Sequence, residues 1–594
     1  MQRLLHNFAD GTSMHGIPRI INARSLPVRL FWTCVCVGAF GMFLWQTTDL
    51  LRRYWKYPKK VNMEIIQKPV PFPSVSVCNT DHLDLQVVDR IDRLFFRYDA
   101  NFTATRGQND WLDEFMDSYD AFYGFAVPLI GLYTNMDASD VKERFNDMLE
   151  VNSRIGMVAN MGPDMASKAG VKLTDFIVSC QFLNEDCELN ASFSTYFDPH
   201  YFNCFTFNPE AILPTRNTRL QGVEYGLSLI LFSGSAGQIP QPEFILPGMQ
   251  ESNNALASGR GARVVVHSPG TRPHPTAEGF DIAPGFSVNI GVKARENERI
   301  GPPHGNCSQH LPGDDKFNYT LIECQNACIQ RHIIETCGCV DNQVPPLEGI
   351  QKQPFCFKLP EMSERCIHLA YASTGAPIND SSCFDSLKEW RKRYHCRKKL
   401  YDNLTILNPG AMDDCNCYPP CHDIIYDSAY SLSTLPAYEG GNSRFHIKVD
   451  EFMTSTFPAE KTDILRRKYP NSSFEAQVRK QVSRLNVHIA DSNIIKTTEA
   501  PDYEAIRLVS DIGGQLGLWI GISVITLFEV LQVRTVYRVF FHAVADSSTP
   551  AYFINQLIFA PVNRYEVHVY RIHKNYLNMI YITPTTDLPD PDVT

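Results

Sequence analysis

Residues Asp511–Gln532 read DIGGQLGLWIGISVITLFEVLQ, an apolar run with a carboxylate near either end. Asp511 and Glu529 are 18 residues apart, about five turns of an α-helix, so both side chains project from one face. Carboxylates inside a membrane segment are costly and usually face a bundle interior or a water-filled path. Repeated around an oligomer axis, these two acids would form the carboxylate rings that line many cation pores.

Glycine recurs in this segment at a helical spacing. Gly513, Gly517 and Gly521 repeat every four residues, and a stripe of small residues lets helices pack closely in lipid. The alternative is a plain membrane anchor with two charged ends. The segment alone leaves both interpretations open.

A second stretch is long and apolar enough to span a membrane. Residues 30–48 are 19 uncharged residues, LFWTCVCVGAFGMFLWQTT, in which Trp32 and Trp45 suit interfacial anchoring. The run is too long and begins too late for a cleavable signal peptide, and it lacks a clear small-residue cleavage site. We therefore expect a retained first transmembrane helix, and two spans place both termini on the same side.

Two features place the region between the spans outside the cell. Of the 18 cysteines, 16 lie there, an even number that is typical of disulfides in an oxidising compartment. The Asn-x-Ser/Thr acceptor sequences for N-glycosylation all lie there too. The asparagines are Asn101, Asn190, Asn306, Asn318, Asn379, Asn403 and Asn471. The formal net charge of −10 would modestly concentrate cations.

Alternating apolar residues predict strands at the beginning, middle and end of this region. A half-buried strand is expected in residues 68–79, and further single strands in 202–208, 226–233, 262–267, 286–294 and 485–498. Helical patterns occupy 85–175, 323–335 and 384–400. We therefore predict an α+β ectodomain whose central antiparallel sheet carries helical modules.

Cysteine spacing and motif content bear on the chemistry. Cys415-x-Cys417-x3-Cys421 closes a dense cysteine block without the paired spacings of tetrahedral zinc sites, which favours a disulfide framework over a metal site. The sequence lacks G-x-S-x-G, H-E-x-x-H and P-loop signatures. We predict no enzyme, no cofactor, no metal and no nucleic-acid partner. The alternative is an ectoenzyme that uses carboxylates without a sequence signature.

Residues 91–133 alternate aromatic and acidic side chains. Amphipathic helices that pack their apolar faces would produce this pattern. The alternative is a surface that binds a ligand with aromatic and cationic groups. Its candidate contacts are Phe115, Asp117, Tyr119, Asp120, Phe122 and Tyr123.

Several strings together resemble the degenerin/epithelial sodium channel family. They are His15-Gly16, FPSVSVCN (72–79), FNCFTFN (202–208), PGFSVNIGV (284–292), CNCYPPC (415–421) and DIGGQLGLWIGIS (511–523). The resemblance covers residues 15–533 in the same order. Within the family, residues 262–286 and 484–503 are most similar to the invertebrate FMRFamide-gated sodium channels.

The resemblance implies a trimer of identical or related subunits in the plasma membrane, multi-pass and with cytosolic termini. It implies sodium conduction that amiloride blocks and an extracellular FMRFamide-type neuropeptide opens. The ectodomain would be hand-like, with a palm sheet and finger, knuckle and thumb helices. The segments are 1–29 (cytosolic), 30–52 (first transmembrane helix), 53–509 (extracellular), 510–534 (second transmembrane helix with pore and filter) and 535–594 (cytosolic tail).

The resemblance also implies roles for single residues. The selectivity filter of the family matches Gly521, Ile522 and Ser523, and its gate and pore positions match Ser510, Asp511 and Glu529. The position implicated in amiloride block matches Gly517. A re-entrant gating motif matches His15 and Gly16. The implied disulfides are Cys78–Cys204, Cys180–Cys187, Cys307–Cys421, Cys324–Cys417 and Cys328–Cys415. The pairing of the six other ectodomain cysteines stays open.

Two other functions fit the same layout. One is a proton-gated or constitutively active sodium channel of the same family. The other is a two-span receptor or adhesion protein without conduction. A trimeric ATP-gated channel shares the two-span layout, but the string DIGGQLGLWIGIS argues against it.

Overall fold

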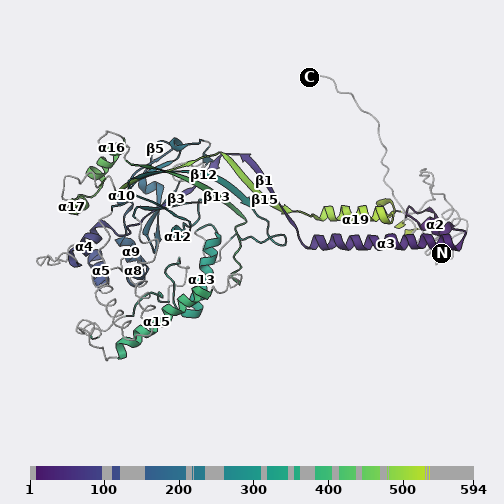
Figure 1. Ribbon diagram of the computed structural model, residues 1–594, viewed down its shortest axis with the longest axis horizontal. Coiled ribbons are helices and arrows are strands. Elements are labelled where there is room, and N and C mark those ends of the chain that lie inside the picture. The colour runs from purple at the N-terminus through teal and green to yellow at the C-terminus, as the bar shows by residue number, and fades with distance from the viewer. Residues whose placement is uncertain are drawn as a thin grey trace, which may run out of the picture. The chain divides into compact units, whose positions relative to one another are not determined.

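The chain divides into two compact units, residues 1–57 with 503–594 and residues 58–502. The computed structural model describes residues 9–95, 110–120, 154–208, 217–218, 220–234, 260–309, 317–344, 353–360, 365, 381–403, 414–435, 444–468, 478, 481–526, 528, 530–531 and 534–535. The sheets and disulfides lie in the second unit, and two long helices form the first (Figure 1).

The larger sheet of the 58–502 unit has eight strands in its described part. Its order is β1 (Lys59–Gln67), β15 (Asn493–Pro501), β12 (Phe286–Glu298), β14 (Val482–Ile489), β9 (Leu227–Phe232), β4 (Ile177–Phe182) and β5 (Glu185–Asp186), with β13 (His422–Thr434) also paired to β12. Strands from both ends of the unit therefore meet in one sheet, and the first strand pairs with the last.

The larger sheet contains both antiparallel and parallel strand pairs, so the prediction of an antiparallel sheet is wrong for two of its strand pairs. β12 runs parallel to β14 and parallel to β15. The expected single strand in residues 485–498 is two strands, because a turn in which the Asp491 carboxylate accepts the Asn493 amide at 2.9 Å separates β14 from β15. Apolar alternation reports which face is buried and not the direction of a strand, so the sequence did not exclude parallel pairing.

A second sheet has five described strands and buries β3 completely. Its order is β11 (Phe280–Ile282), β10 (Ala262–His267), β3 (Ser74–Asn79), β7 (Phe202–Phe207) and β6 (Phe193–Asp198). The expectation of a half-buried strand was wrong, since every residue of β3 is buried. The neighbouring strands β10 and β7 bring polar groups that bond the buried Ser76 side chain.

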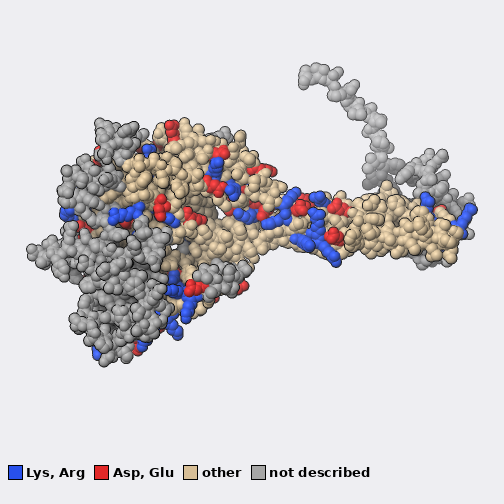
Figure 2. Space-filling view, viewed as in Figure 1, with Lys and Arg blue, Asp and Glu red and all other residues tan. Residues whose placement is uncertain are grey.

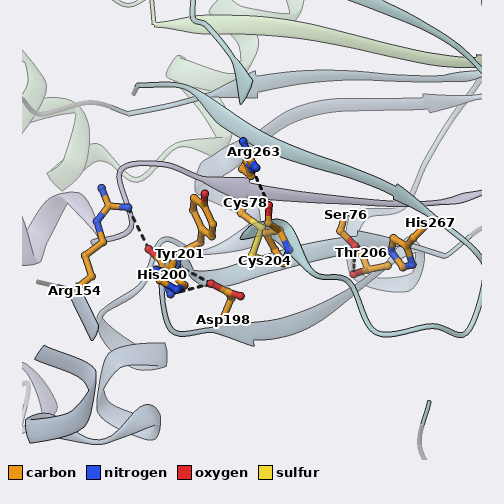
Figure 3. The surroundings of a disulfide bond; sticks show 11 residues. Ser76, Cys78, Arg154, Asp198, His200, Tyr201, Cys204, Thr206, Arg263 and His267 are labelled. Atoms are coloured by element: carbon orange, nitrogen blue, oxygen red, sulfur yellow. Dashed lines mark hydrogen bonds between the residues drawn. A yellow bond between two sulfur atoms is a disulfide. The ribbon is translucent and has the colours of Figure 1, made fainter. Parts of the chain in front are cut away.

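Ser76 shows how that buried polar face is satisfied (Figure 3). The Ser76 hydroxyl lies 2.7 Å from the Thr206 hydroxyl and 2.9 Å from Nε2 of His267. Nδ1 of His267 lies 3.1 Å from the Ser268 carbonyl, which can only accept, so Nδ1 carries the proton and Nε2 accepts. Burial lowers the pKa of His267 to about 4, so the imidazole is neutral at physiological pH.

Helices cover the sheets of this unit (Figure 1). They are α4 (Leu85–Phe95), α5 (Asp110–Asp120), α8 (Arg154–Met161), α9 (Pro163–Ala169), α10 (Leu173–Phe176), α11 (Leu189–Ser192), α12 (Pro275–Glu278), α13 (Leu321–Cys337), α15 (Ser381–Asp402), α16 (Arg444–Glu451) and α17 (Ala459–Lys468). α5, α8 and α9 pack on one another, and α17 packs on α4. One apolar cluster joins these helices to α15.

Disulfide bonds cross-link the strands, helices and loops of the 58–502 unit. The bonds are Cys78–Cys204, Cys180–Cys187, Cys307–Cys421, Cys324–Cys417, Cys328–Cys415, Cys337–Cys396 and Cys339–Cys356. The first five are the pairs that the family resemblance implies. The last two join cysteines that the sequence left unassigned, and Cys337–Cys396 ties α13 to α15.

The other unit is built on α3 (Leu26–Trp55) and α19 (Ala505–Trp519), which pack on each other, with the short helix α2 (Ile17–Asn22). Large apolar side chains of α3 point outward; Trp45 is 67% exposed. On the face that Figure 2 shows, charged side chains gather at the two ends of this helix pair. Among the described residues, α3 is long and apolar enough to cross a membrane.

Candidate functional site

The helix α19 ends inside the apolar segment Asp511–Gln532. It stops at Trp519, and a helical turn resumes at residues 524–526. Gly521 lies in the link with φ +72°, a left-handed conformation that favours glycine. The three residues matched to the filter, Gly521 to Ser523, therefore lie in a non-helical link between two helical stretches.

The His15–Gly16 turn packs directly against this link. The His15 amide donates to the Ile520 carbonyl at 2.8 Å. A Cβ added to Gly521 would lie 2.6 Å from Cγ of His15, so no side chain fits there. Gly16 has φ +82°, and a Cβ on it would collide with Sγ of Cys36 on α3. The structure thus brings together two motifs from opposite ends of the chain.

A second contact, which the sequence analysis missed, fixes the helical turn after the link. The Thr526 hydroxyl accepts the Ser523 amide at 3.0 Å, and the Ser523 hydroxyl lies 3.4 Å from the Thr526 amide. Ser13 then places its hydroxyl 2.6 Å from that of Thr526, which is 2% exposed. The Ser-x-x-Thr spacing resembles a capping box, so the contact between Ser523 and Thr526 could have been predicted from the sequence. The contact of Ser13 with Thr526 could not, because the two residues lie far apart in the chain.

The first half of α19 holds the predicted gate residues. Ser510 is exposed and Asp511 is half-buried. The Tyr503 hydroxyl donates to Oδ2 of Asp511 at 2.5 Å. Burial, and next the hydrogen bond to the carboxylate, raise the pKa of Tyr503 to about 12, so the phenol keeps its proton. Sequence reasoning did not single out Tyr503, because an aromatic residue before a helix has many structural uses.

One polar contact ties α19 to α3 near the link. The Trp519 indole donates to Oε1 of Gln46 at 2.7 Å and to Oε1 of Gln515 at 3.0 Å. Gly517 has open space around its Cα, with no atom within 4 Å of an added Cβ. Glu529, the predicted inner acid, lies outside the described residues.

The proposed ligand contacts on α5 divide by burial. Phe115 and Tyr119 are 0% and 2% exposed, with ring centroids 5.9 Å apart inside the core. Their rings do not reach solvent, so the structure favours core packing for this pair over direct ligand contact. Asp117 is exposed on the same helix, which ends at Asp120. Phe122 and Tyr123 lie outside the described residues.

Two groups of side chains in the described part of the chain have the donor spacing of a metal site, and neither is suited to one. Cys328 and Cys415, beside His332, are joined in a disulfide and cannot ligate. Glu296 and Glu298 lie beside His422, but the ammonium groups of Lys68 and Lys496 approach the two carboxylates to 2.5 and 2.6 Å. Those ion pairs already neutralise the two carboxylates.

The glycosylation sequences can be placed for four asparagines. Asn190, Asn306, Asn318 and Asn403 are all exposed. Asn101, Asn379 and Asn471 lie outside the described residues.

Comparison with known proteins identifies the family. The model of the amiloride-sensitive sodium channel family matches residues 8–533. The chain is 28% identical over 563 residues to the FMRFamide-activated amiloride-sensitive sodium channel of Cornu aspersum, covering 89% of this chain and 82% of that protein.

Two other relatives match at similar coverage. The degenerin-like protein asic-2 of Caenorhabditis elegans is 26% identical over 91% of this chain and 87% of its own length. The alpha subunit of the epithelial sodium channel of Xenopus laevis is 24% identical over 90% and 81%. Members of the matched family are ion channels and not enzymes. The chain therefore belongs to the amiloride-sensitive sodium channel family.

Proposed function

We propose that this protein is a trimeric, amiloride-sensitive sodium channel that an extracellular neuropeptide of the FMRFamide type opens. The observation that carries the proposal is the 28% identity, over 89% of the chain, to a channel named for activation by FMRFamide. The partners are the peptide, membrane lipid and identical or related subunits; the permeant ion is sodium, and no cofactor takes part.

In this proposal the non-helical link that follows α19 is the ion filter. A link with φ +72° at Gly521 leaves carbonyl groups outside a helical ladder, and carbonyl rings are one way in which channels replace the hydration shell of an ion. Non-helical backbone at membrane depth is tolerated where it lines a water-filled path. Asp511 and Glu529 would then form acidic rings on either side of the filter.

The proposed topology has two spans, α3 and a segment within residues 510–534. The 53–509 region would be extracellular, and the tails 1–29 and 535–594 cytosolic, in the plasma membrane. Among the described residues, seven disulfides and four exposed glycosylation sequences support an oxidising, glycosylating compartment for the 58–502 unit.

The peptide must bind the open state more tightly than the closed one, since otherwise it shifts no equilibrium. An exposed carboxylate such as Asp117 suits the cationic arginine of an RFamide peptide. We retain Asp117 and Asp120 as contacts, with Phe122 and Tyr123 as the aromatic part, and assign Phe115 and Tyr119 to the core that positions them.

Voltage clamp of oocytes that express the full chain tests the function. We expect FMRFamide to evoke an inward current that follows the sodium gradient and that amiloride blocks. A current evoked by acid alone, or present without stimulus, would replace peptide gating by the first alternative. If neither stimulus evokes a current and a variant with a bulky residue at Ser510 also conducts none, the result would favour the alternative of a receptor or adhesion protein without conduction.

Two variants of α5 test the binding surface. Asp117→Asn should raise the peptide concentration for half-maximal current by about tenfold, the loss expected for a charge-assisted hydrogen bond. Glu114→Gln removes a second exposed acid of the same helix and should change little. Equal shifts in both variants would point to general electrostatics and remove Asp117 as a contact.

A further inference from the structure

Tyr503 lies two residues before α19, and its hydroxyl bonds Asp511 in the first half of that helix. Its ring is 2% exposed, and its hydroxyl lies 2.5 Å from Oδ2 of Asp511. An O–H···O⁻ bond of this length belongs to the strong, charge-assisted class. The bond fixes one oxygen of a carboxylate that is otherwise half-buried.

Three neighbours hold the ring of Tyr503 in place. The guanidinium carbon of Arg53, in the last turn of α3, lies 5.4 Å from the ring centroid, and that of Arg507 lies 6.0 Å away. The ring of Tyr54 packs edge-on at 6.5 Å. Cations over an aromatic ring draw electron density from it, which makes the phenol a better donor to Asp511.

We propose that Tyr503 is a positioning residue for the pore acid Asp511 and thereby stabilises the closed channel. The inference rests on the proposed function, in which copies of Asp511 converge on one axis when the outer gate is closed. Carboxylates brought together repel one another. A hydrogen bond from Tyr503 spreads the charge of each carboxylate and holds it in one orientation, so the repulsion in the closed state is smaller.

The test uses Tyr503→Phe, which removes the hydroxyl and keeps the ring beside the two arginines. Without the bond the closed state is less stable. The amiloride-sensitive current before peptide, as a fraction of the maximal current, should rise about tenfold, the effect of one charge-assisted hydrogen bond. Tyr54→Phe is the matched control, because that ring packs on Tyr503 and its hydroxyl makes no bond to Asp511 in the described structure.

A double-mutant cycle shows whether Tyr503 acts through Asp511. In an Asp511→Asn background the repulsion is absent, so Tyr503→Phe should add no further resting current. Independent, additive effects of the two substitutions would overturn the proposal, as would equal resting currents for Tyr503→Phe, Tyr54→Phe and the parent channel.

A measurement without current separates this inference from the proposed function. Thermal unfolding of the purified full chain should show a lower midpoint for Tyr503→Phe than for Tyr54→Phe, and no difference once Asp511 is Asn. If the parent channel never conducts but this pattern holds, the bond stands and the channel function fails. If it conducts and resting current is unchanged, the gating role fails alone.

Discussion

The two units of this chain handle their apolar side chains in opposite ways. In the 58–502 unit, Phe72 and Phe205 are 1% and 2% exposed, and disulfides fix the surrounding strands. In the helical unit, Trp45 and Ile506 are 67% and 81% exposed. Several of the specific contacts there are polar, such as Trp519 to Gln46. Apolar burial organises a protein in water, whereas small and polar contacts join helices whose outer surfaces meet lipid.

The largest expected effect is on the unit organised by burial and disulfides. Cys78→Ser with Cys204→Ser removes a buried bond that joins β3 to β7 across a sequence separation of 126 residues. We expect the free energy of unfolding of this unit to fall by about 2–5 kcal/mol, with loss of protein from the cell surface. Surface labelling and thermal unfolding measure this.

The control removes cysteines from the other unit. Cys34 and Cys36 are free thiols of α3, and replacing both with Ser should leave surface expression nearly unchanged. Equal losses from the two pairs of substitutions would erase the contrast between the units.

A second effect concerns pH and the buried polar face of β3. The folded unit holds His267 with a pKa of about 4, below the ordinary value of 6.5, because of burial. The unfolded chain therefore binds more protons between these values, and stability is full above pH 6.5 and falls as pH drops toward 4. The loss for this group is about 3 kcal/mol.

Variants at two histidines check the cause of that pH dependence. His267→Gln keeps a polar side chain opposite Ser76 and should make the decline in unfolding temperature from pH 6.5 to pH 4 shallower. His422→Gln, on the exposed end of β13, should leave the slope as it was. A slope that is the same in all three proteins would contradict the role of His267.

A third effect tests the non-helical link that follows α19. Gly521→Ala places a methyl group 2.6 Å from His15 at φ +72°, and such strain costs about 1–3 kcal/mol. We expect a loss of amiloride-sensitive current of about 5- to 150-fold, measured against surface protein. Gly514→Ala meets no atom within 4 Å and should keep the current. Full current in Gly521→Ala would show that this turn is not required.

The smallest effect concerns one hydrogen bond between helices. Gln46→Leu removes the contact at 2.7 Å to the Trp519 indole. Interhelical hydrogen bonds in membranes contribute about 0.6–2 kcal/mol, so the unfolding midpoint should fall slightly. Gln515→Ala, which removes the acceptor within α19 at 3.0 Å, serves for comparison and should have the smaller effect. A larger fall in the unfolding midpoint for Gln515→Ala than for Gln46→Leu would show that the bond within α19 contributes more than the bond between the helices.

The sequence alone determined the family, the strands at 202–208 and 262–267 and the apolar helix at 30–52, because these rest on local patterns of apolar residues and cysteines. The structure places the first strand at Phe202–Phe207 and the helix at Leu26–Trp55. The family resemblance also matched Gly521 to the selectivity filter. The sequence did not determine strand direction, and it mistook the buried β3 for a half-buried strand, because the groups that satisfy Ser76 come from strands far along the chain.

Tertiary structure alone decided which residues meet. His15 and Gly521, Ser13 and Thr526, and Cys337 and Cys396 are separated by long stretches of chain, and only the folded backbone brings their atoms within contact distance. It also decided that Phe115 faces the core while Asp117 faces solvent. A helical pattern shows that two faces differ, but which face is covered depends on what packs against it.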